Sequence, residues 1–197
     1  MNKKTLRKTY LDKRKTLSEE NFHDRNQELR DLLRDFQPLK DSSAIHIFLS
    51  IPFQKEPDTR GIIDDLRKMG KKIIVPRIKG NDLEHIELTR DVQLVKNRYG
   101  ILEPIDGQEF NPGSIDLVLI PMVICDKKGN RIGYGKGYYD AFLAENTNML
   151  KVGMSLSPPL DEIAYSEAHD VKLDYCITPY RIYDFRATGS SSNSTSN

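Results

Sequence analysis

The sequence lacks an excess of either charge, with 30 lysine and arginine residues against 29 acidic residues in a chain of 197. Balanced charge gives no overall field that would favour nucleic acid or an anionic membrane. The sequence also lacks an apolar run near the roughly 20 residues of a membrane span. Its start, Met1-Asn2-Lys3-Lys4, leads into further charged residues and not into the apolar region of a signal peptide. These absences predict a cytoplasmic protein that binds neither nucleic acid nor membrane, and we expect a monomer.

Cysteine is scarce as well. Cys125 and Cys176 lie far apart in the sequence and form no Cys-x-x-Cys motif. This usage is typical of reduced thiols in a cytosolic protein, and we expect both side chains to be partly buried. It does not support a structural zinc site. No Ser-His-Asp or Cys-His arrangement is suggested by spacing either, so nothing indicates covalent catalysis.

Apolar segments alternate between strand and helix patterns along most of the chain. Helices are expected over the first sixteen residues, after Ser18, and over residues 59–69 and 138–145. Strands are expected over residues 44–49, 72–76, 83–88, 115–121, 152–156 and 175–178. The unbroken apolar run at 115–121 is typical of a central parallel strand covered on both faces. The alternation predicts an α/β fold with a mainly parallel sheet.

A single domain is expected over residues 1–186, because this length is sufficient to bury a good core. Residues 187–197 are rich in Ser, Asn, Thr and Gly, a composition typical of a disordered tail. Residues 91–96 are expected to form a helical turn, and 99–104 a turn-rich loop. Ligands of such sheets bind beyond the carboxyl ends of the strands, so we expect three loops to meet there: the loop after Leu49, the loop near Tyr99 and the glycine-rich stretch of residues 129–140.

A glycine-rich stretch, residues 129–140, follows the predicted central strand and precedes a predicted helix. Glycines at positions 133, 135 and 137 remove side chains where a backbone would approach a ligand closely. Arg131 and Lys136 add positive charge, and the helix start adds unpaired N–H groups. The stretch matches neither the dinucleotide fingerprint nor a Walker loop, and glycine-rich turns also occur where a chain merely reverses. The cations, the paired tyrosines and the aspartate are what indicate phosphate binding.

Two aspartates are candidates for holding a metal ion. Asp140 lies one turn into the predicted helix, and a carboxylate there tolerates bound phosphates only with a cation between them. A Mg²⁺ ligand is therefore a coherent role, since this ion takes one or two carboxylates plus phosphate oxygens. Asp170 precedes the last predicted strand and is a possible second ligand. The alternatives are a helix-start aspartate that complements the dipole and an ordinary loop aspartate.

The basic N-terminal helix has a face that could meet a polyanion. Lys3 and Arg7 stand four residues apart and therefore lie on one helical face. A solvated surface helix and a nucleic-acid contact are the alternatives, although Tyr10 is the one aromatic residue of the stretch. Phosphate binding by Lys3 and Arg7 is one hypothesis among these three.

Four further residues are candidates for binding a ligand other than phosphate. Glu56 lies in the loop after the first strand, where it could accept hydrogen bonds from a ligand or remain a surface glutamate. Tyr99, Tyr138 and Tyr139 carry rings that stack on flat heterocycles or fill a core.

The segment Arg131-Ile132-Gly133-Tyr134-Gly135-Lys136-Gly137-Tyr138-Tyr139-Asp140 resembles the signature of the 5-formyltetrahydrofolate cyclo-ligase family. The resemblance extends over nearly the whole chain apart from the tail. It includes Lys3-x-x-x-Arg7, Glu56-Pro57-Asp58-Thr59, Gly100-Ile101-Leu102-Glu103-Pro104, Asp116-Leu117-Val118-Leu119-Ile120-Pro121 and His169-Asp170. The family usually has Leu in place of Ile132, a volume-conserving exchange.

The resemblance implies a three-layer α/β/α sandwich and an ATP- and Mg²⁺-dependent closure of 5-formyltetrahydrofolate to 5,10-methenyltetrahydrofolate. It implies catalytic roles for Arg131 and Lys136, and Mg²⁺ ligation by Asp140 and Asp170. ATP binding is implied for Lys3, Lys4, Arg7, Arg131, Ile132, Gly133, Tyr134, Gly135, Lys136, Gly137, Tyr138 and Tyr139. Binding of the reduced folate is implied for Leu49, Ser50, Glu56, Tyr99, Tyr134, Gly135, Lys136, Gly137 and Tyr138, with Tyr139 also lining the folate site.

Other functions of such a chain are also conceivable. One is an enzyme, such as a phosphosugar isomerase or an acyl-CoA transferase, that uses the glycine loop for a substrate phosphate without hydrolysing ATP. Another is a binding protein that sequesters folate, or a nucleic-acid module with a strongly salt-dependent affinity. Phosphate release that depends on 5-formyltetrahydrofolate would separate the cyclo-ligase from all of these.

Overall fold

A seven-stranded sheet forms the centre of the computed structural model, which describes residues 2–80, 82–97, 100–164 and 170–186. The five inner strands run parallel and the two edge strands run antiparallel to their neighbours. In order across the sheet the strands are β11 (Ile182–Asp184), β10 (Tyr175–Ile177), β9 (Leu150–Met154), β6 (Leu117–Pro121), β1 (Ala44–Ile47), β2 (Lys72–Lys79) and β3 (Asp82–Glu87). The predicted α/β fold with a mainly parallel sheet is confirmed.

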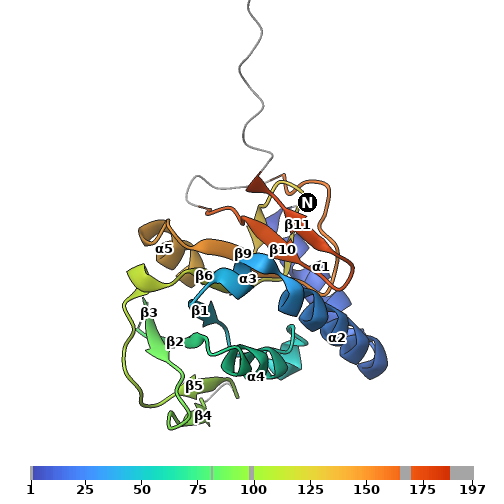
Figure 1. The fold of residues 1–197 in the computed structure, drawn as a ribbon. Helices are drawn as coiled ribbons and strands as arrows, with labels where there is room; N and C mark the ends of the chain where they lie inside the picture. Colours follow the sequence, from blue (N-terminus) through green and yellow to red (C-terminus); the bar gives the residue numbers. More distant parts are fainter. Residues whose placement is uncertain (1, 81, 98–99, 165–169, 187–197) are drawn as a thin grey trace, which may run out of the picture.

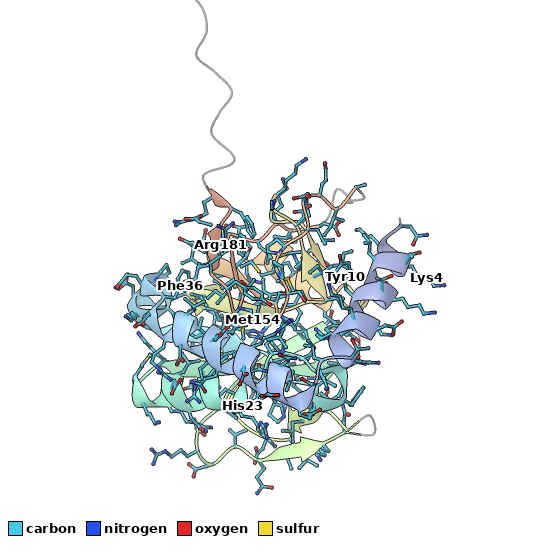
Figure 2. All side chains as sticks on the ribbon, turned by 90° about the vertical axis from the view of Figure 1, so that its right-hand side faces the viewer. Lys4, Tyr10, His23, Phe36, Met154 and Arg181 are labelled. Carbon is cyan, nitrogen blue, oxygen red and sulfur yellow. The ribbon has the colours of Figure 1, made fainter. Side chains whose placement is uncertain are left out.

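Helices cover both faces of this sheet (Figure 1). One face packs against α2 (Glu19–Asp35), α3 (Gln37–Asp41) and α4 (Arg60–Lys68), and the other against α5 (Tyr138–Glu145). Figure 2 shows α2 lying across the sheet, with Met154 of β9 behind it. β6 is buried on both faces, as expected for the central strand. The three-layer α/β/α sandwich implied by the family resemblance is therefore confirmed.

The first helix, α1 (Lys3–Lys15), stands apart from this layer and packs on a small hairpin. The hairpin consists of β7 (Ile124–Cys125) and β8 (Arg131–Ile132). Leu6, Tyr10 and Leu11 of α1 contact a separate apolar cluster that contains Ile124 and Ile132. The glycine-rich stretch therefore begins in a β-hairpin, which the sequence pattern did not indicate.

The helix ends follow from local sequence. Ser18 caps α2 by accepting a hydrogen bond from Asn21 N at 3.1 Å, as predicted. Gly70 follows α4 with a φ of +70°, in the left-handed region that glycine favours. Pro38 lies just past the end of α2, as predicted, and in the first turn of α3, a short helix that was not expected. Among the described residues, no helix has the length and apolar character needed to cross a membrane.

Several local expectations were wrong. Residues 91–96 form no helical turn, and the predicted loop at 99–104 is partly a strand: β4 (Leu94–Lys96) pairs with β5 (Leu102–Pro104). Cross-strand pairing determines the conformation of both segments, and local propensity does not report it. Two single-turn 3₁₀ helices, η1 (Pro52–Gln54) and η2 (Pro112–Ser114), complete the set of elements.

The two cysteines are closer to each other, and more deeply buried, than expected. Cys125 and Cys176 are both free thiols with no exposed surface. Their Sγ atoms lie 3.4 Å apart, because β7 passes beside β10 in the core. The prediction of partly buried thiols was wrong in degree.

The order of the strands creates a switch point between β1 and β6. The chain leaves β1 towards β2 on one side, whereas β6 and β9 lie on the other side. The loops that follow β1 and β6 therefore depart from the same carboxyl edge in opposite directions. Open α/β sheets bind ligands in the crevice at such a point.

Candidate functional site

Three segments meet at this switch point. They are the β1 loop (residues 48–59), the glycine loop (residues 133–137) between β8 and α5, and the inner face of α1. Arg7, which is half-buried, and Arg14, which is buried, join them through hydrogen bonds from α1 to both loops. Most of the residues that the family resemblance implicates lie on these three segments.

A buried carboxylate shapes the turn that leads into the glycine loop. Asp126 has no exposed surface, and its Oδ1 accepts hydrogen bonds from Lys128 N and Asn130 N, both at 2.9 Å. Its Oδ2 accepts one from Ile163 N at 2.8 Å. These bonds satisfy backbone groups that would otherwise be unpaired, and they fold the chain back so that β8 pairs with β7. Asp126 thus fixes the position from which Arg131 projects.

The guanidinium of Arg131 lies between two carboxylates. Its side chain is 5% exposed, and Nη2 donates to Asp140 Oδ1 at 2.6 Å. Nη1 donates to the carbonyl of Val171. Burial lowers the pKa of Arg131, and the charges of Asp140 and Asp170 oppose that shift. Lys3 Nζ lies 2.6 Å from Asp170 Oδ2. The structure thus brings four of the predicted phosphate- and metal-binding residues, Lys3, Arg131, Asp140 and Asp170, into one charged cluster.

Arg7 explains why the glycine loop needs glycine. Its Nε donates to Gly133 O at 2.7 Å. Gly135 has a φ of +87°, and a Cβ there would lie 3.0 Å from the Arg7 Cζ atom. A larger residue at position 135 would therefore be strained twice, by its backbone conformation and by the guanidinium. Gly137, at a φ of +76°, starts α5 in the same left-handed region.

Arg14 joins all three segments of the site. The residue is 6% exposed. Its Nε donates to Gln54 O in the β1 loop at 2.8 Å, and its Nη1 to Met122 O beyond β6 at 3.1 Å. Its Nη2 donates to the Tyr134 hydroxyl in the glycine loop at 2.6 Å. One buried cation therefore connects α1 to the loops on both sides of the switch point.

Glu56 is a buried acid at the centre of this arrangement. It is 3% exposed, and its Oε2 accepts a hydrogen bond from Ile51 N at 2.6 Å. The Tyr134 hydroxyl also acts on this carboxylate and favours its charged form. Burial raises the pKa of Glu56, while Tyr134, the Ile51 hydrogen bond and the charge of Arg14 oppose the rise. A surface glutamate, the alternative left open by the sequence, is excluded.

The remainder of the β1 loop is held by its own polar groups. Ser50 Oγ donates to Pro57 O at 2.7 Å and accepts from Thr59 N at 2.7 Å, so its hydroxyl supports the loop. Leu49 is buried at the end of β1. Lys55 has a φ of +48°, which is strained for a residue with a side chain, and its ammonium lies 2.9 Å from Glu19. The loop therefore presents Glu56 from a constrained backbone.

The other predicted site residues differ in location. Lys4 and Lys136 are exposed, and Tyr138 is half-buried. Tyr139 faces the core, where its ring centroid lies 5.9 Å from that of His46, and its hydroxyl has no partner among the described residues. Tyr99 lies outside the described residues.

Arg14 is the principal residue that the sequence interpretation did not identify. It was counted among the basic residues of a solvated helix, yet positions 3, 7, 10 and 14 follow one helical face. That face packs on the hairpin through Tyr10, which is the signal that could have identified a buried Arg14. His46 and His85, both buried, also passed unnoticed because strand periodicity does not distinguish a buried imidazole from a surface one.

Comparison with known proteins is consistent with this geometry. The 5-formyltetrahydrofolate cyclo-ligase family matches residues 1–179. The 5-formyltetrahydrofolate cyclo-ligase of Mus musculus is 33% identical over 155 residues, covering 68% of this chain and 72% of that protein. The protein of the same name from Escherichia coli (strain K12) is 27% identical over 180 residues, covering 88% of this chain and 98% of that protein.

A solved structure extends the likeness to the whole fold. The NMR structure of Aquifex aeolicus 5,10-methenyltetrahydrofolate synthetase superposes with a TM-score of 0.84 at 29% identity. The superposition covers 100% of this chain and 97% of the other. Together with the match over residues 1–179, these likenesses show that the chain belongs to the 5-formyltetrahydrofolate cyclo-ligase family.

Proposed function

We propose that this protein converts 5-formyltetrahydrofolate to 5,10-methenyltetrahydrofolate with ATP and Mg²⁺, releasing ADP and phosphate. The names of its relatives, cyclo-ligase and methenyltetrahydrofolate synthetase, support the folate reaction. The single observation that carries the proposal is the meeting of the glycine loop, the Glu56 carboxylate and the cations of α1 at the switch point.

The reaction requires activation of the formyl oxygen. The oxygen of an amide is a poor leaving group, so the γ-phosphoryl group of ATP is first transferred to it. The lone pair of N10 then forms the bond to the formyl carbon, the C–O bond breaks, phosphate leaves and N10 loses its proton. The protein contributes positioning and charge neutralisation, which call for cations and N–H donors rather than a nucleophile.

We assign the phosphates of ATP to the cationic side of the site. Lys3, Lys4, Arg7 and Arg131 supply positive charge there, together with the amides of the glycine loop. Lys136 and Arg131 are assigned to the transferring phosphoryl group. The ion pair with Asp140 holds the Arg131 guanidinium in a fixed direction, which favours charge stabilisation without reorganisation.

The folate side of the site is assigned to Glu56 and the tyrosines. A carboxylate accepts two N–H bonds at once, which suits the amino-pyrimidinone edge of a pterin. The assignment of Glu56 to the folate side is supported by its burial and by its interaction with Tyr134 of the glycine loop. Tyr138, in the first turn of α5, is the half-buried ring nearest in sequence to that loop.

Asp140 and Asp170 fit a magnesium ion that is held mainly by substrate. Both carboxylates act on the Arg131 guanidinium. Mg²⁺ takes one or two protein carboxylates plus phosphate oxygens and waters. Within the part of the chain that the structure describes, no group of three or more His, Cys, Asp or Glu side chains could hold a metal. The donor set suits Mg²⁺ bound with ATP, where the ion would neutralise charge on the phosphoryl group.

One spectrophotometric assay tests the proposal. With 5-formyltetrahydrofolate and ATP present, absorbance of the methenyl product should rise when Mg²⁺ is supplied and stay flat when it is withheld. Phosphate release that does not depend on the folate would indicate a different enzyme. Folate binding without product in the complete mixture would indicate sequestration, and either result would overturn the proposed reaction.

A further inference from the structure

The hydrogen bonds around Arg14 have a fixed direction. A guanidinium has donors and no acceptor, so the Tyr134 oxygen must accept the bond from Arg14 Nη2 at 2.6 Å. The hydroxyl proton of Tyr134 is then available for the Glu56 carboxylate, whose charged form Tyr134 favours. Arg14 therefore donates to Tyr134, and the direction of this bond leaves Tyr134 able to donate in turn to Glu56, which can only accept while it is a carboxylate.

Arg14 also fixes two backbone segments of the site. Its bonds to Gln54 O and Met122 O tie the β1 loop and the end of β6 to the same guanidinium. Gln54 is two residues from Glu56, so the backbone that carries the acid is held by the cation that orients its partner. No other side chain type supplies three diverging N–H bonds in one plane.

We propose that Arg14 is a positioning residue for the folate substrate, which acts through Tyr134 and the backbone of Gln54 to hold the Glu56 side chain in a fixed orientation. The inference rests on the proposed function, in which Glu56 accepts N–H bonds from the pterin edge. Arg14 itself touches neither substrate. Its effect should therefore fall on folate recognition rather than on ATP.

The electrostatics of the site agree with this geometry. The titratable groups acting with Glu56 are Arg14 on α1, Tyr134 in the glycine loop and Tyr139 on α5. Burial raises the pKa of Glu56, and Tyr134 and Arg14 oppose the rise. Removing either opposing group should let the acid protonate at higher pH. Folate binding in such a variant should then weaken at a pH where the wild-type protein still binds.

The test compares Arg14→Met and Tyr134→Phe with wild type. Each substitution should raise the KM for 5-formyltetrahydrofolate about 10-fold, the typical effect of losing a hydrogen bond to a charged group, with little change in the KM for ATP. As the pH is lowered, the folate KM of both variants should also begin to rise at a higher pH than that of the wild type. Because the action of Tyr134 on Glu56 depends on Arg14, the double variant should be little worse than Arg14→Met alone. Arg14→Lys keeps the charge but not the planar set of N–H donors, so its folate KM should lie between those of Arg14→Met and the wild type.

Lys15→Met is the matched control, since it removes one positive charge from the exposed face of the same helix. Unchanged folate KM in Tyr134→Phe, or equal rises in the folate and ATP KM values, would overturn the positioning role. Tyr134→Phe removes a single hydroxyl, so it carries the test even if Arg14→Met does not fold. If the wild type shows no turnover, the proposed reaction is contradicted, but the positioning role can still be tested. Calorimetry of 5-formyltetrahydrofolate binding without ATP then compares the folate affinities of the wild type and the variants.

Discussion

Two regions of this molecule bury polar side chains, and they do so in opposite ways. At the switch point, Arg14, Arg131 and Glu56 are buried with hydrogen-bonded or charged partners. Beneath α5, the imidazoles of His46 and His85 lie 5.3 Å apart, centroid to centroid. Both nitrogens of His46 and Nδ1 of His85 have no hydrogen-bond partner among the described residues.

In the first region hydrogen bonds and charges fix the orientation of the buried polar side chains, whereas in the second region the imidazoles only fill space in the core. Buried polar groups with partners fix geometry, and breaking such a set leaves an uncompensated charge. Unpartnered imidazoles pack as flat rings, here against Phe142 at 5.2 and 4.2 Å, and remain neutral. The first region should therefore govern activity and stability at neutral pH, whereas the second should matter when acid forces a proton onto it.

The largest effect is expected from Arg131→Ala. Loss of a preorganised charge at the phosphoryl group should lower kcat by about 10²–10³-fold. Folate affinity should change far less, because Glu56 lies on another segment. Steady-state kinetics with each substrate varied would measure both. Arg25→Ala is the control, since Arg25 also donates to a backbone carbonyl, Leu156 O at 3.0 Å, but lies on α2. Full turnover with only folate affinity reduced would contradict the assignment.

The next effect is on stability, in Arg14→Leu. This substitution leaves the carbonyls of Gln54 and Met122 and the Tyr134 hydroxyl without their donor. A buried carbonyl left without a donor costs about 1–3 kcal/mol, so the free energy of unfolding should fall by about 3 kcal/mol. Urea denaturation at neutral pH would measure it. Lys15→Leu should change the value by less than about 0.5 kcal/mol. Equal losses in the two variants would mean that the Arg14 bonds contribute nothing.

Acid should expose the second region. Burial lowers the pKa of His85 from 6.5 to about 4, and that of His46 well below 6.5. Below pH 6.5 the unfolded chain binds protons that the folded chain does not. The contribution of neutral His85 to the free energy of unfolding is therefore fully present above pH 6.5 and is lost as the pH falls from 6.5 to 4. At pH 5, His85 alone should account for a loss of about 2 kcal/mol.

Urea denaturation as a function of pH would measure this loss. His85→Leu should flatten the profile over the same window, whereas His23→Gln, at an exposed position of α2, should leave it unchanged. A profile of His85→Leu that still falls as steeply as the wild type would place the acid sensitivity elsewhere.

The smallest effect is expected from His46→Leu at pH 7.5. The substitution removes two unpartnered nitrogens at nearly constant volume, so the free energy of unfolding should stay equal or rise, by up to about 1 kcal/mol. The same urea measurement applies. A loss of 2 kcal/mol or more would show that the His46 nitrogens contribute to stability in the native protein, and the contrast between the two regions would disappear.

Several helices and strands, and the family, could be predicted from the sequence alone. The 115–121 run, the Ser18 cap and Gly70 predicted elements that the structure confirms, because apolar periodicity and capping chemistry are local properties. The glycine-rich stretch indicated the family, which the match over residues 1–179 confirms. Its assignments to ATP, folate and Mg²⁺ stay predictions.

Other features depended on distant parts of the chain. The hairpin that carries Arg131 exists because β7 pairs with β8 around the buried Asp126, and β4 is a strand because β5 lies beside it. Periodicity reports which face of a segment is apolar, but not which partner lies across from it. Cys125 and Cys176 likewise meet only through packing of the core.

Sequence by itself determined the fold class, the family and the chemical equipment: the cations, the glycines and the carboxylates. Tertiary structure decided their relations. In the tertiary structure Arg14 is buried instead of exposed, Asp140 forms an ion pair with Arg131, and the Glu56 side chain is buried. The reason is physical: residue type fixes what a side chain can donate, accept or charge, whereas burial and partners, which set its pKa and direction, arise from contacts between distant segments.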